Sequence, residues 1–390
     1  MTADYISLLA IVAAAVICPI IAQIVPKKVI PEAVLLLLAG AVLGPHMVGT
    51  IQDDQTIQFM AKLGLAFQFL IAGYEIDPTL LTGKRGMKGL ATWAVTFALA
   101  LGAAALLFDP AENFMAFAAV AIAMTSTALG TLIGIMKERG LEGTALGDNI
   151  MSYGVWGQLC PVIAIALLLS TRRAYQTLIV LAILVGICVL VALGTRRVKN
   201  RDGKLMQIIE AKGDSSSQLF VRCAVLLMVV LVAAASVFNL DVILGAFAAG
   251  FVLRFILPEG HQRTDDKLNA IAYGFFIPIF FVESGMKIDL LSVGAAPTRL
   301  VIAVLALVVV RALPAFVAQS LGKAPKLSVR NRAAVSAYIT TALSIIVAVS
   351  STAVDAGALT QAGASLMISG AAISVFLMPL LAQVLSEPEQ

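Results

Sequence analysis

The sequence predicts an all-α polytopic membrane protein, and three observations carry this prediction. Of its 390 residues, 60% are hydrophobic and only 13% are charged, whereas soluble globular chains are about half apolar and a quarter charged. Apolar runs long enough to cross a hydrocarbon core of about 30 Å follow one another along the chain. Lysine and arginine gather in alternate loops between these runs, which is the pattern of the positive-inside rule.

The apolar runs predict about 13 transmembrane helices. The first seven are expected at 4–24, 30–44, 59–76, 88–108, 114–136, 144–170 and 174–194. The remaining six are expected at 218–238, 241–257, 267–287, 298–321, 332–354 and 360–385. The longest loop, 195–217, is basic and joins two halves of the chain. We therefore expect residues 1–390 to form a single membrane transport unit with no soluble regulatory domain on this chain.

The charged loops predict the orientation of the chain in the membrane. The odd-numbered loops carry most of the basic residues, as at Lys27 and Lys28 in the first and Arg196 and Arg197 in the seventh. Since loops rich in lysine and arginine stay in the cytoplasm, we expect the N-terminus outside and the C-terminus inside. The expected location is the cytoplasmic (inner) membrane of a bacterium.

The two halves of the chain share weak similarities that occur in the same order. FLIAGYEID at 69–77 resembles FVESGMKID at 281–289, and AGAVL at 39–43 resembles AGFVL at 249–253. MTSTALG at 124–130 has a counterpart in YITTALS at 338–344. The partners are seven predicted helices apart, and an odd offset reverses the direction of a helix. The sequence thus predicts an inverted-topology repeat of helices 2–6 and 9–13, a common plan of transporters.

Hydroxyl side chains stand out in two of the apolar helices. Buried polar groups are costly in a bilayer unless they line a site, and matching polar runs in two repeats indicate a transporter site. We therefore predict that these hydroxyl residues bind the transported ion or solute: Thr125, Ser126, Thr127, Thr340, Thr341 and Ser344.

Few ionisable residues lie within the predicted helices, and such residues are functional candidates by default. Arg311 lies in the middle of its helix and is expected to have a buried partner, either in a site or in a structural ion pair. Glu283 forms an i,i+4 pair with Lys287, or it is a carboxylate that binds and releases protons, or it is the partner of Arg311. Asp148, near the start of its helix, either draws cations toward the site or simply complements the helix dipole.

Gln158 is a neutral polar residue near the middle of the sixth predicted helix. Gly157 and Pro161 flank it and weaken the helix locally, which leaves backbone carbonyls free. We predict that Gln158 belongs to the binding site. The four cysteines lie in apolar runs without metal-ligand spacing, so we predict neither a metal site nor a cofactor. No nucleophile–base arrangement is present in the sequence, so an enzyme and a nucleic-acid-binding protein are not expected.

Several stretches together resemble the cation:proton antiporter-2 family, which has a sodium/proton exchanger-like membrane domain. The resemblance implies monovalent cation (Na⁺ or K⁺)/proton antiport by elevator-like alternating access, a homodimer, and two half-broken helices that cross at the bilayer midplane. It also implies a core bundle at 88–170 and 298–386 and dimerisation helices at 4–76 and 174–287. The stretches are MTSTALG from 124, GQLCPVIAIALLL from 157, LGAFAAGFVLR from 244, FFIPIFFVESGMKIDL from 275, VVVRALPA from 308 and ITTALSIIVAV from 339.

One departure from this family concerns the transported species. Its members usually carry an acidic residue in the sixth helix that binds the cation and the proton in competition, and the matching position here is Gln158, which cannot titrate. Arg311 matches the basic residue that the family pairs with that carboxylate. Two alternatives therefore stand beside cation/proton antiport: a transporter of the same fold for an anion or small polar organic solute, and an Asp/Glu-to-Gln variant trapped in one conformation.

Overall fold

The computed structural model describes residues 2–24, 30–52, 54–81, 83–106, 109, 113–168, 186, 218–237, 241–256, 262–321 and 327–387. Within these ranges the regular structure is helical, and no strand is present. Ten helical segments are long and apolar enough to cross a membrane, and two shorter apolar helices accompany them. The predicted all-α polytopic architecture is thereby confirmed. The predicted helix at 174–194 and the loop at 195–217 lie outside the described residues.

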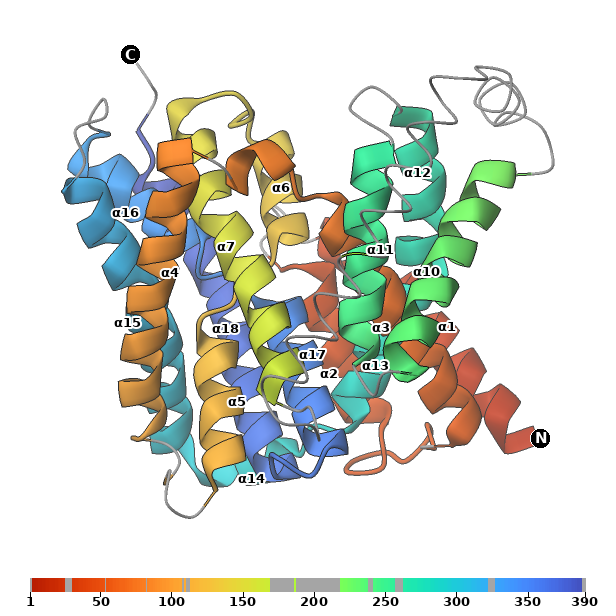
Figure 1. Cartoon of the computed structure of the whole chain (residues 1–390). Coiled ribbons are helices and arrows are strands. Elements are labelled where there is room, and N and C mark those ends of the chain that lie inside the picture. The colour runs from red at the N-terminus through yellow and green to blue at the C-terminus, as the bar shows by residue number, and fades with distance from the viewer. Residues whose placement is uncertain are drawn as a thin grey trace. The chain divides into compact units, whose positions relative to one another are not determined.

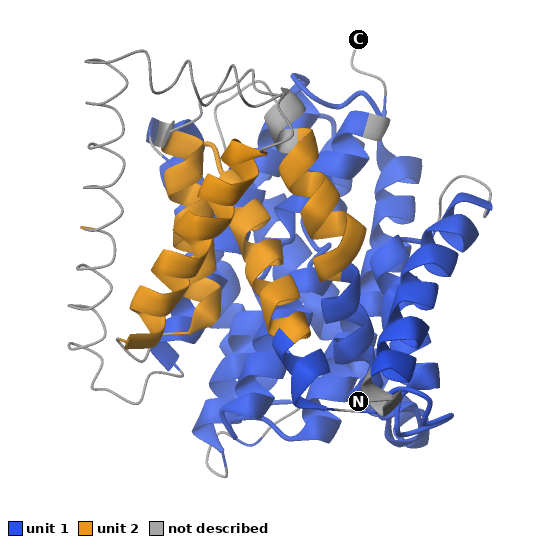
Figure 2. Cartoon of the chain, turned by 90° about the vertical axis from the view of Figure 1, so that its right-hand side faces the viewer, with its two compact units in different colours: residues 1–59, 78–169, 278–390 blue, residues 60–77, 170–277 orange. Residues whose placement is uncertain are grey.

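The chain divides into two compact units (Figure 2). The first consists of residues 1–59, 78–169 and 278–390, and the second of residues 60–77 and 170–277. The predicted division into a transport core and a dimerisation scaffold concerns motion and assembly, so it stays a prediction.

The first unit contains most of the helices (Figure 1). Its helix α18 packs against four neighbours, α14, α15, α16 and α17, while α7 packs against α4, α5, α6 and α16. These helices are α1 (Thr2–Ile24), α2 (Glu32–Leu43), η2 (Pro78–Leu81), α4 (Gly83–Ala104), α5 (Phe114–Met124), α6 (Leu129–Glu138), α7 (Ala145–Leu168), α13 (Ile277–Met286), α14 (Leu290–Ala295), α15 (Pro297–Ser320), α16 (Val329–Tyr338), α17 (Leu343–Asp355) and α18 (Gln361–Leu385).

The second unit holds most of α3 (Gln55–Tyr74) together with α10 (Leu219–Val237), α11 (Val242–Ile256) and α12 (Gln262–Ile271). A π-helical turn, η3 (Ala272–Phe276), follows α12 and leads into α13. The single helix predicted at 267–287 is therefore three consecutive helical segments. Short turns of this kind shift the helix faces without changing the hydrophobic pattern, which is why periodicity alone does not reveal them.

Helix α2 crosses α13 at van der Waals distance because glycines stand at the contact. A Cβ added to Gly40 would lie 2.0 Å from the carbonyl oxygen of Val282, and one added to Gly285 would lie 2.2 Å from that of Leu37. No side chain fits at either position, so the backbones touch directly.

A contact of the same form occurs between α3 and α11 in the second unit. A Cβ on Gly250 would lie 1.9 Å from the carbonyl oxygen of Leu70, and one on Gly73 would lie 2.1 Å from that of Phe247. The glycines of the two crossings are those that the similar stretches align, because Gly250 corresponds to Gly40 and Gly285 to Gly73. The matching contacts support the internal repeat, and its inverted direction stays a prediction.

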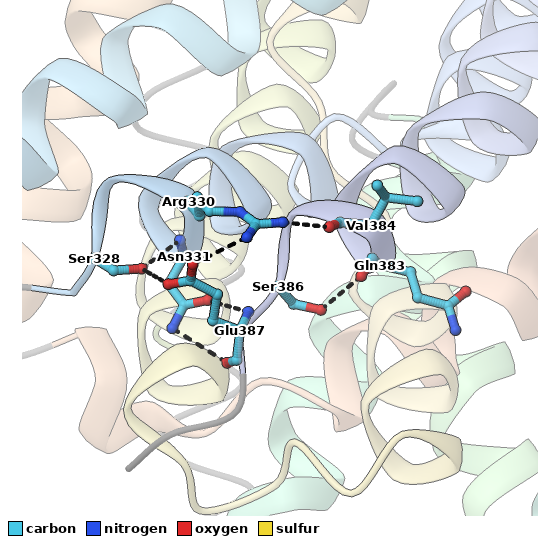
Figure 3. A network of polar contacts seen from close by, with 7 residues as sticks. All are labelled: Ser328, Arg330, Asn331, Gln383, Val384, Ser386 and Glu387. Atoms are coloured by element: carbon cyan, nitrogen blue, oxygen red, sulfur yellow. Dashed lines mark hydrogen bonds and ion pairs between the residues drawn. The ribbon is translucent and has the colours of Figure 1, made fainter.

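The residues after α18 fold back onto the start of α16 (Figure 3). The Ser328 hydroxyl, which caps α16 by accepting from the Asn331 N–H, also donates to the Glu387 carboxylate at 2.8 Å. Arg330 pairs with the same carboxylate at 3.1 Å, and the Glu387 N–H donates to the Asn331 side chain at 2.8 Å. We call this set, Ser328, Arg330, Asn331 and Glu387, the C-terminal strap.

Candidate functional site

Two helices of the first unit are interrupted where the hydroxyl-rich runs lie. α5 ends at Met124 and α6 begins at Leu129, while α16 ends at Tyr338 and α17 begins at Leu343. All eight residues of the two interruptions, 125–128 and 339–342, are buried. The segment 329–355 is the most enclosed of the candidate spans: 94% of the residues in its apolar stretch are buried, compared with 33% in α15. Both interruptions therefore lie in the interior of the first unit, where α5 packs against α7 and α17, and α17 packs against α18.

Four of the predicted binding hydroxyls terminate the helices that carry them. Thr125 donates to the Ile122 carbonyl at 2.7 Å and Ser126 to the Ala123 carbonyl at 2.6 Å. Thr340 and Thr341 donate in the same way to carbonyls of Ala337 and Tyr338. Since the last carbonyls of a helix lack intrahelical partners, these hydroxyls stabilise the two buried C-terminal ends.

The two interruptions are joined to each other by hydrogen bonds. The Ala128 N–H donates to the Thr341 carbonyl at 2.8 Å, and the Thr127 hydroxyl donates to the Ile339 carbonyl at 2.6 Å. The Thr127 N–H donates in turn to the Gly157 carbonyl of α7 at 2.8 Å. Thr127 thus connects both interruptions with α7.

Arg311 of α15 reaches into this junction with only 2% of its surface exposed. Its Nε donates to the Thr127 hydroxyl at 2.9 Å and its Nη2 to the Tyr153 carbonyl of α7 at 3.0 Å. The guanidinium lies directly on Gly157, where an added Cβ would stand 2.0 Å from Nη2 and 2.6 Å from the Thr127 hydroxyl oxygen. Sequence reasoning missed Tyr153, because a backbone carbonyl carries no residue signature.

Gln158 of α7 is fully buried beside the start of α6. Its Oε1 accepts from the Leu129 N–H at 2.8 Å, and the N-cap residue Ala128 has no side chain that can do so. Gln158 therefore supplies the cap that α6 lacks. A carboxylate oxygen in the same place would accept the same bond and would also be favoured by the positive end of the α6 dipole.

The two acidic candidates, Glu283 and Asp148, pair with residues other than Arg311. Glu283, 4% exposed, forms an ion pair with Lys287 one helical turn further on. Asp148 pairs with Arg85 at 3.4 Å, and both side chains are more than half exposed, so this contact is worth less than about 1 kcal/mol. Throughout the described ranges, no carboxylate forms an ion pair with Arg311.

The structure thus brings together a subset of the predicted residues: Thr127, Gln158, the Thr341 carbonyl and Arg311. Ser344 lies in the first turn of α17, whose N-cap Ala342 provides no side-chain cap. Among the described side chains there is no group of three or more His, Cys, Asp or Glu that fits a metal ion. The junction contains one guanidinium, one carboxamide, hydroxyls and helix ends.

These features define a polytopic integral membrane protein with a polar site between two interrupted helices. The description "sodium/hydrogen exchanger, transmembrane" belongs to the family model that matches residues 12–385. Because the match covers nearly the whole sequence, the chain belongs to this family. Its family membership places it among the transmembrane sodium/hydrogen exchangers.

Individual relatives have names of the same kind. YjbQ of Bacillus subtilis (strain 168), whose name places it among the Na(+)/H(+) antiporters, is 26% identical over 328 residues, which is 78% of this chain and 52% of YjbQ. The Na(+)/H(+) antiporter NhaS4 of Synechocystis sp. is 27% identical over 291 residues, 67% of this chain and 68% of NhaS4. The chain therefore spans about half the length of YjbQ.

A solved structure supports the fold. The sodium proton antiporter MjNhaP1 from Methanocaldococcus jannaschii superimposes with a TM-score of 0.65 over 98% of this chain and 99% of that chain. The two sequences are 18% identical, so this likeness concerns the architecture alone.

Proposed function

We propose that the chain is a secondary active antiporter that exchanges a monovalent cation, Na⁺ or K⁺, for protons at the junction of the two interrupted helices. The observation that carries the proposal is that junction itself: eight buried residues without helical structure, linked by the Ala128–Thr341 and Thr127–Ile339 hydrogen bonds. Irregular backbone at membrane depth is tolerated where it serves a site. The family and the names of its relatives support the same function.

Alternating access in this proposal is an elevator-like movement of a core made of 88–170 and 298–386. The helices at 4–76 and 174–287 form the stationary scaffold and the homodimer contact. Hydrogen bonds from the interruptions to α7 and α15 support the movement of this core as one body. The protein lies in the bacterial cytoplasmic membrane with its N-terminus outside and its C-terminus inside.

Proton coupling needs a titrating group, and Gln158 is not one. Within the described ranges Glu283 is the one carboxylate that is buried, and its pair with Lys287 offers two states, protonated and ion-paired. We assign proton coupling to Glu283 and a minor cation-attracting role to the exposed Asp148. Glu283→Gln is expected to abolish exchange in proteoliposomes, whereas Asp148→Asn reduces it only partly; undiminished exchange by Glu283→Gln rejects the assignment.

A second candidate follows from Arg311, whose positive charge has no carboxylate partner in the described part of the chain. A positive, otherwise neutral site favours an anion or a small polar organic solute. The third possibility, a variant held in one conformation, fits the ability of Gln158 to imitate a protonated carboxyl group.

The deciding experiment compares the native chain with Gln158→Glu in proteoliposomes that contain a pH-sensitive dye. Pulses of Na⁺, K⁺ and Li⁺ are given to both. The substituted carboxylate keeps the acceptor for the Leu129 N–H, so the fold is expected to persist. Exchange by the native chain supports cation/proton antiport. Exchange by Gln158→Glu alone rejects it for the native chain and leaves the second candidate or the trapped variant.

A further inference from the structure

One face of α15 exposes large apolar side chains along the whole length of the helix. Residues four apart on a helix form a continuous row, and each residue of one such row is between 45% and 81% exposed. We call this row the α15 ridge: Val301, Leu305, Val309, Leu313, Val317 and Leu321. The 24 residues of α15 rise about 36 Å, more than a hydrocarbon core of about 30 Å. The ridge therefore faces lipid chains, and its last residues reach the membrane–water interface.

A guanidinium lies at the end of the α15 ridge. It belongs to Arg332 of α16, the helix that packs beside α15 (Figure 1). Its Nη1 donates to the Ser320 hydroxyl at 2.9 Å, and its Cζ stands 6.0 Å from the centre of the Phe316 ring. The Ser320 hydroxyl donates in turn to the Phe316 carbonyl at 2.9 Å. Because Phe316 and Ser320 form the row next to Val317 and Leu321, the guanidinium is held directly beside the ridge.

The charge of Arg332 is not neutralised by a carboxylate in the described part of the chain. Arg330, two residues earlier, pairs with Glu387 at 3.1 Å, whereas the side-chain hydrogen bond of Arg332 goes to Ser320. Its Nε is enclosed without an acceptor, and Nη2 also has no acceptor among the described residues but lies at the surface. An uncompensated positive charge with an accessible donor therefore stands at the end of the ridge.

An apolar row that ends at such a guanidinium has the chemistry to bind a phospholipid. Acyl chains cover apolar surface within the hydrocarbon core, and guanidinium groups bind phosphate. Basic pockets between transmembrane helices on the cytoplasmic side bind anionic headgroups, and Arg332 lies on that side in the predicted orientation. A zwitterionic headgroup carries its own cation, which offsets the charge of its phosphate. An anionic phospholipid therefore complements the site better.

We propose that α15 and α16 form a binding site for one anionic phospholipid, with its phosphate on Arg332 and an acyl chain along the α15 ridge. Nη2 donates to the phosphate, while Ser320 and Phe316 fix the plane of the guanidinium. The inference goes beyond the proposed function and does not depend on it, because none of these residues belongs to the junction of the interrupted helices.

Lipid titration of the purified full chain in detergent tests the site without any transport. Native mass spectrometry counts the lipids bound per chain when palmitoyl-oleoyl phosphatidylglycerol or phosphatidylcholine is added in equal amounts. We expect one saturable phosphatidylglycerol per chain, bound more tightly than phosphatidylcholine. Arg332→Gln should lower the affinity for phosphatidylglycerol about fivefold and leave that for phosphatidylcholine unchanged. Arg332→Lys, which serves if Arg332→Gln does not fold, should lower it by a smaller factor, because an ammonium group lacks the planar fork.

Arg330→Gln is the matched control for charge. It removes a guanidinium from the same helix, but one that is already paired with Glu387, so phosphatidylglycerol should bind with native affinity. Equal losses in the Arg330 and Arg332 variants would show a general attraction by net charge and overturn the site. Equal binding of phosphatidylglycerol and phosphatidylcholine by the native chain overturns it as well.

A second matched pair examines the α15 ridge. Val317 is 45% exposed, and Val229 of α10 is 47% exposed. Val317→Ser should lower the affinity for phosphatidylglycerol about fourfold, the equivalent of one buried CH₂ group, whereas Val229→Ser should not change it; equal effects contradict a role of the ridge.

Soluble phosphates separate the headgroup from the whole lipid. Inorganic phosphate and glycerol 3-phosphate, each at the concentration of the lipid, should not displace bound phosphatidylglycerol, because neither contacts the α15 ridge. Displacement by either compound identifies a site for soluble phosphate and rejects the phospholipid as its occupant.

Discussion

Thr127 is the residue on which the junction depends most, because it joins three parts of the chain. Its hydroxyl accepts from Arg311 and donates to Ile339, while its N–H donates to Gly157. Neighbouring Thr125, equally buried, bonds only within its own helix end. Thr125 therefore caps the end of its own helix, whereas Thr127 connects separate parts of the chain.

Thr127→Val keeps the shape and removes both hydroxyl bonds, one of them to a charged group. The expected loss of stability is about 2–4 kcal/mol, with loss of transport. Thr125→Val should cost about 1 kcal/mol, since only one neutral bond is lost. Thermal unfolding in detergent and exchange in proteoliposomes measure both; equal effects of the two variants contradict the joining role of Thr127.

Gly157 leaves free the space that the Arg311 guanidinium occupies. An alanine there puts its Cβ 2.0 Å from Nη2, so Arg311 must leave the Tyr153 carbonyl. Gly157→Ala should destabilise the chain by about 1–3 kcal/mol and abolish transport. Gly102 of α4 has nothing within 4 Å of an added Cβ, and Gly102→Ala should be neutral or slightly stabilising. A fully active Gly157→Ala protein rejects this account.

At the scale of elements, the two glycine crossings have contacts of the same form, and each crossing joins a helix from the first half of the chain to one from the second half. Gly40→Ala places a Cβ 2.0 Å from a backbone oxygen, and Gly250→Ala places one 1.9 Å from another. Because helix backbones must separate in either case, both substitutions should lower the melting temperature by several degrees and to a similar extent. Gly274→Ala, with open space around it, is the control. A large effect of only one of the pair contradicts their equivalence.

Helix α14 has a start that responds to pH. The Asp289 carboxylate accepts from the N–H groups of Leu291 and Ser292 at 3.1 Å each, and the Ser292 hydroxyl also donates to it. Hydrogen bonds from Ser292 lower the pKa of Asp289 below its ordinary value of 3.8. The ionised cap therefore stabilises α14 fully above that value, and the stabilisation is lost as the pH falls through the lowered pKa.

Hydrogen exchange of the α14 amides, corrected for intrinsic rates, measures this effect. Protection should be constant at neutral pH and should drop in strong acid, while Asp289→Asn should show no such drop. Acid-insensitive protection in the native chain argues against the capping role of Asp289.

At the scale of the whole molecule, a cysteine-labelling experiment tests the predicted orientation of the chain in the membrane. Val329 at the start of α16 is 61% exposed and Leu291 in α14 is 72% exposed, and α14 and α16 lie toward opposite ends of the first unit (Figure 1). On a background without the four native cysteines, Leu291→Cys should react with an impermeant maleimide in intact cells. Val329→Cys should react only after the cells are opened. The reverse pattern places the N-terminus inside.

Much of the fold could be predicted from the sequence because hydrophobic length and basic loops act locally. The helices α1, α7, α15 and α18 lie where their apolar runs predict them. Neither the division of 267–287 into three segments nor the short helix α14 could be predicted from the sequence, because both depend on how neighbouring helices pack. The hydroxyl-rich runs indicated the two interruptions, yet which hydroxyls bond their own helix and which join the interruptions is decided by contacts between residues more than 200 positions apart, such as Thr127 and Ile339.

The contacts of Glu283 and Arg311 differ in how far the sequence could predict them. Its spacing from Lys287 allowed an i,i+4 pair, and the structure contains that pair. The partner of Arg311 was beyond local reasoning, because Tyr153 contributes a carbonyl that every residue type possesses.

The C-terminal strap has a practical consequence for handling the protein. Glu387 lies two residues after the end of α18 and is held by Ser328, Arg330 and Asn331. An affinity tag or fluorescent protein fused within a few residues of Glu387 would pull on the first turn of α16, the half-helix that ends at the junction. A spacer of some twenty flexible residues, about 25 Å in r.m.s. length, would relieve that pull and keep activity measurements on tagged protein comparable with those on the native chain.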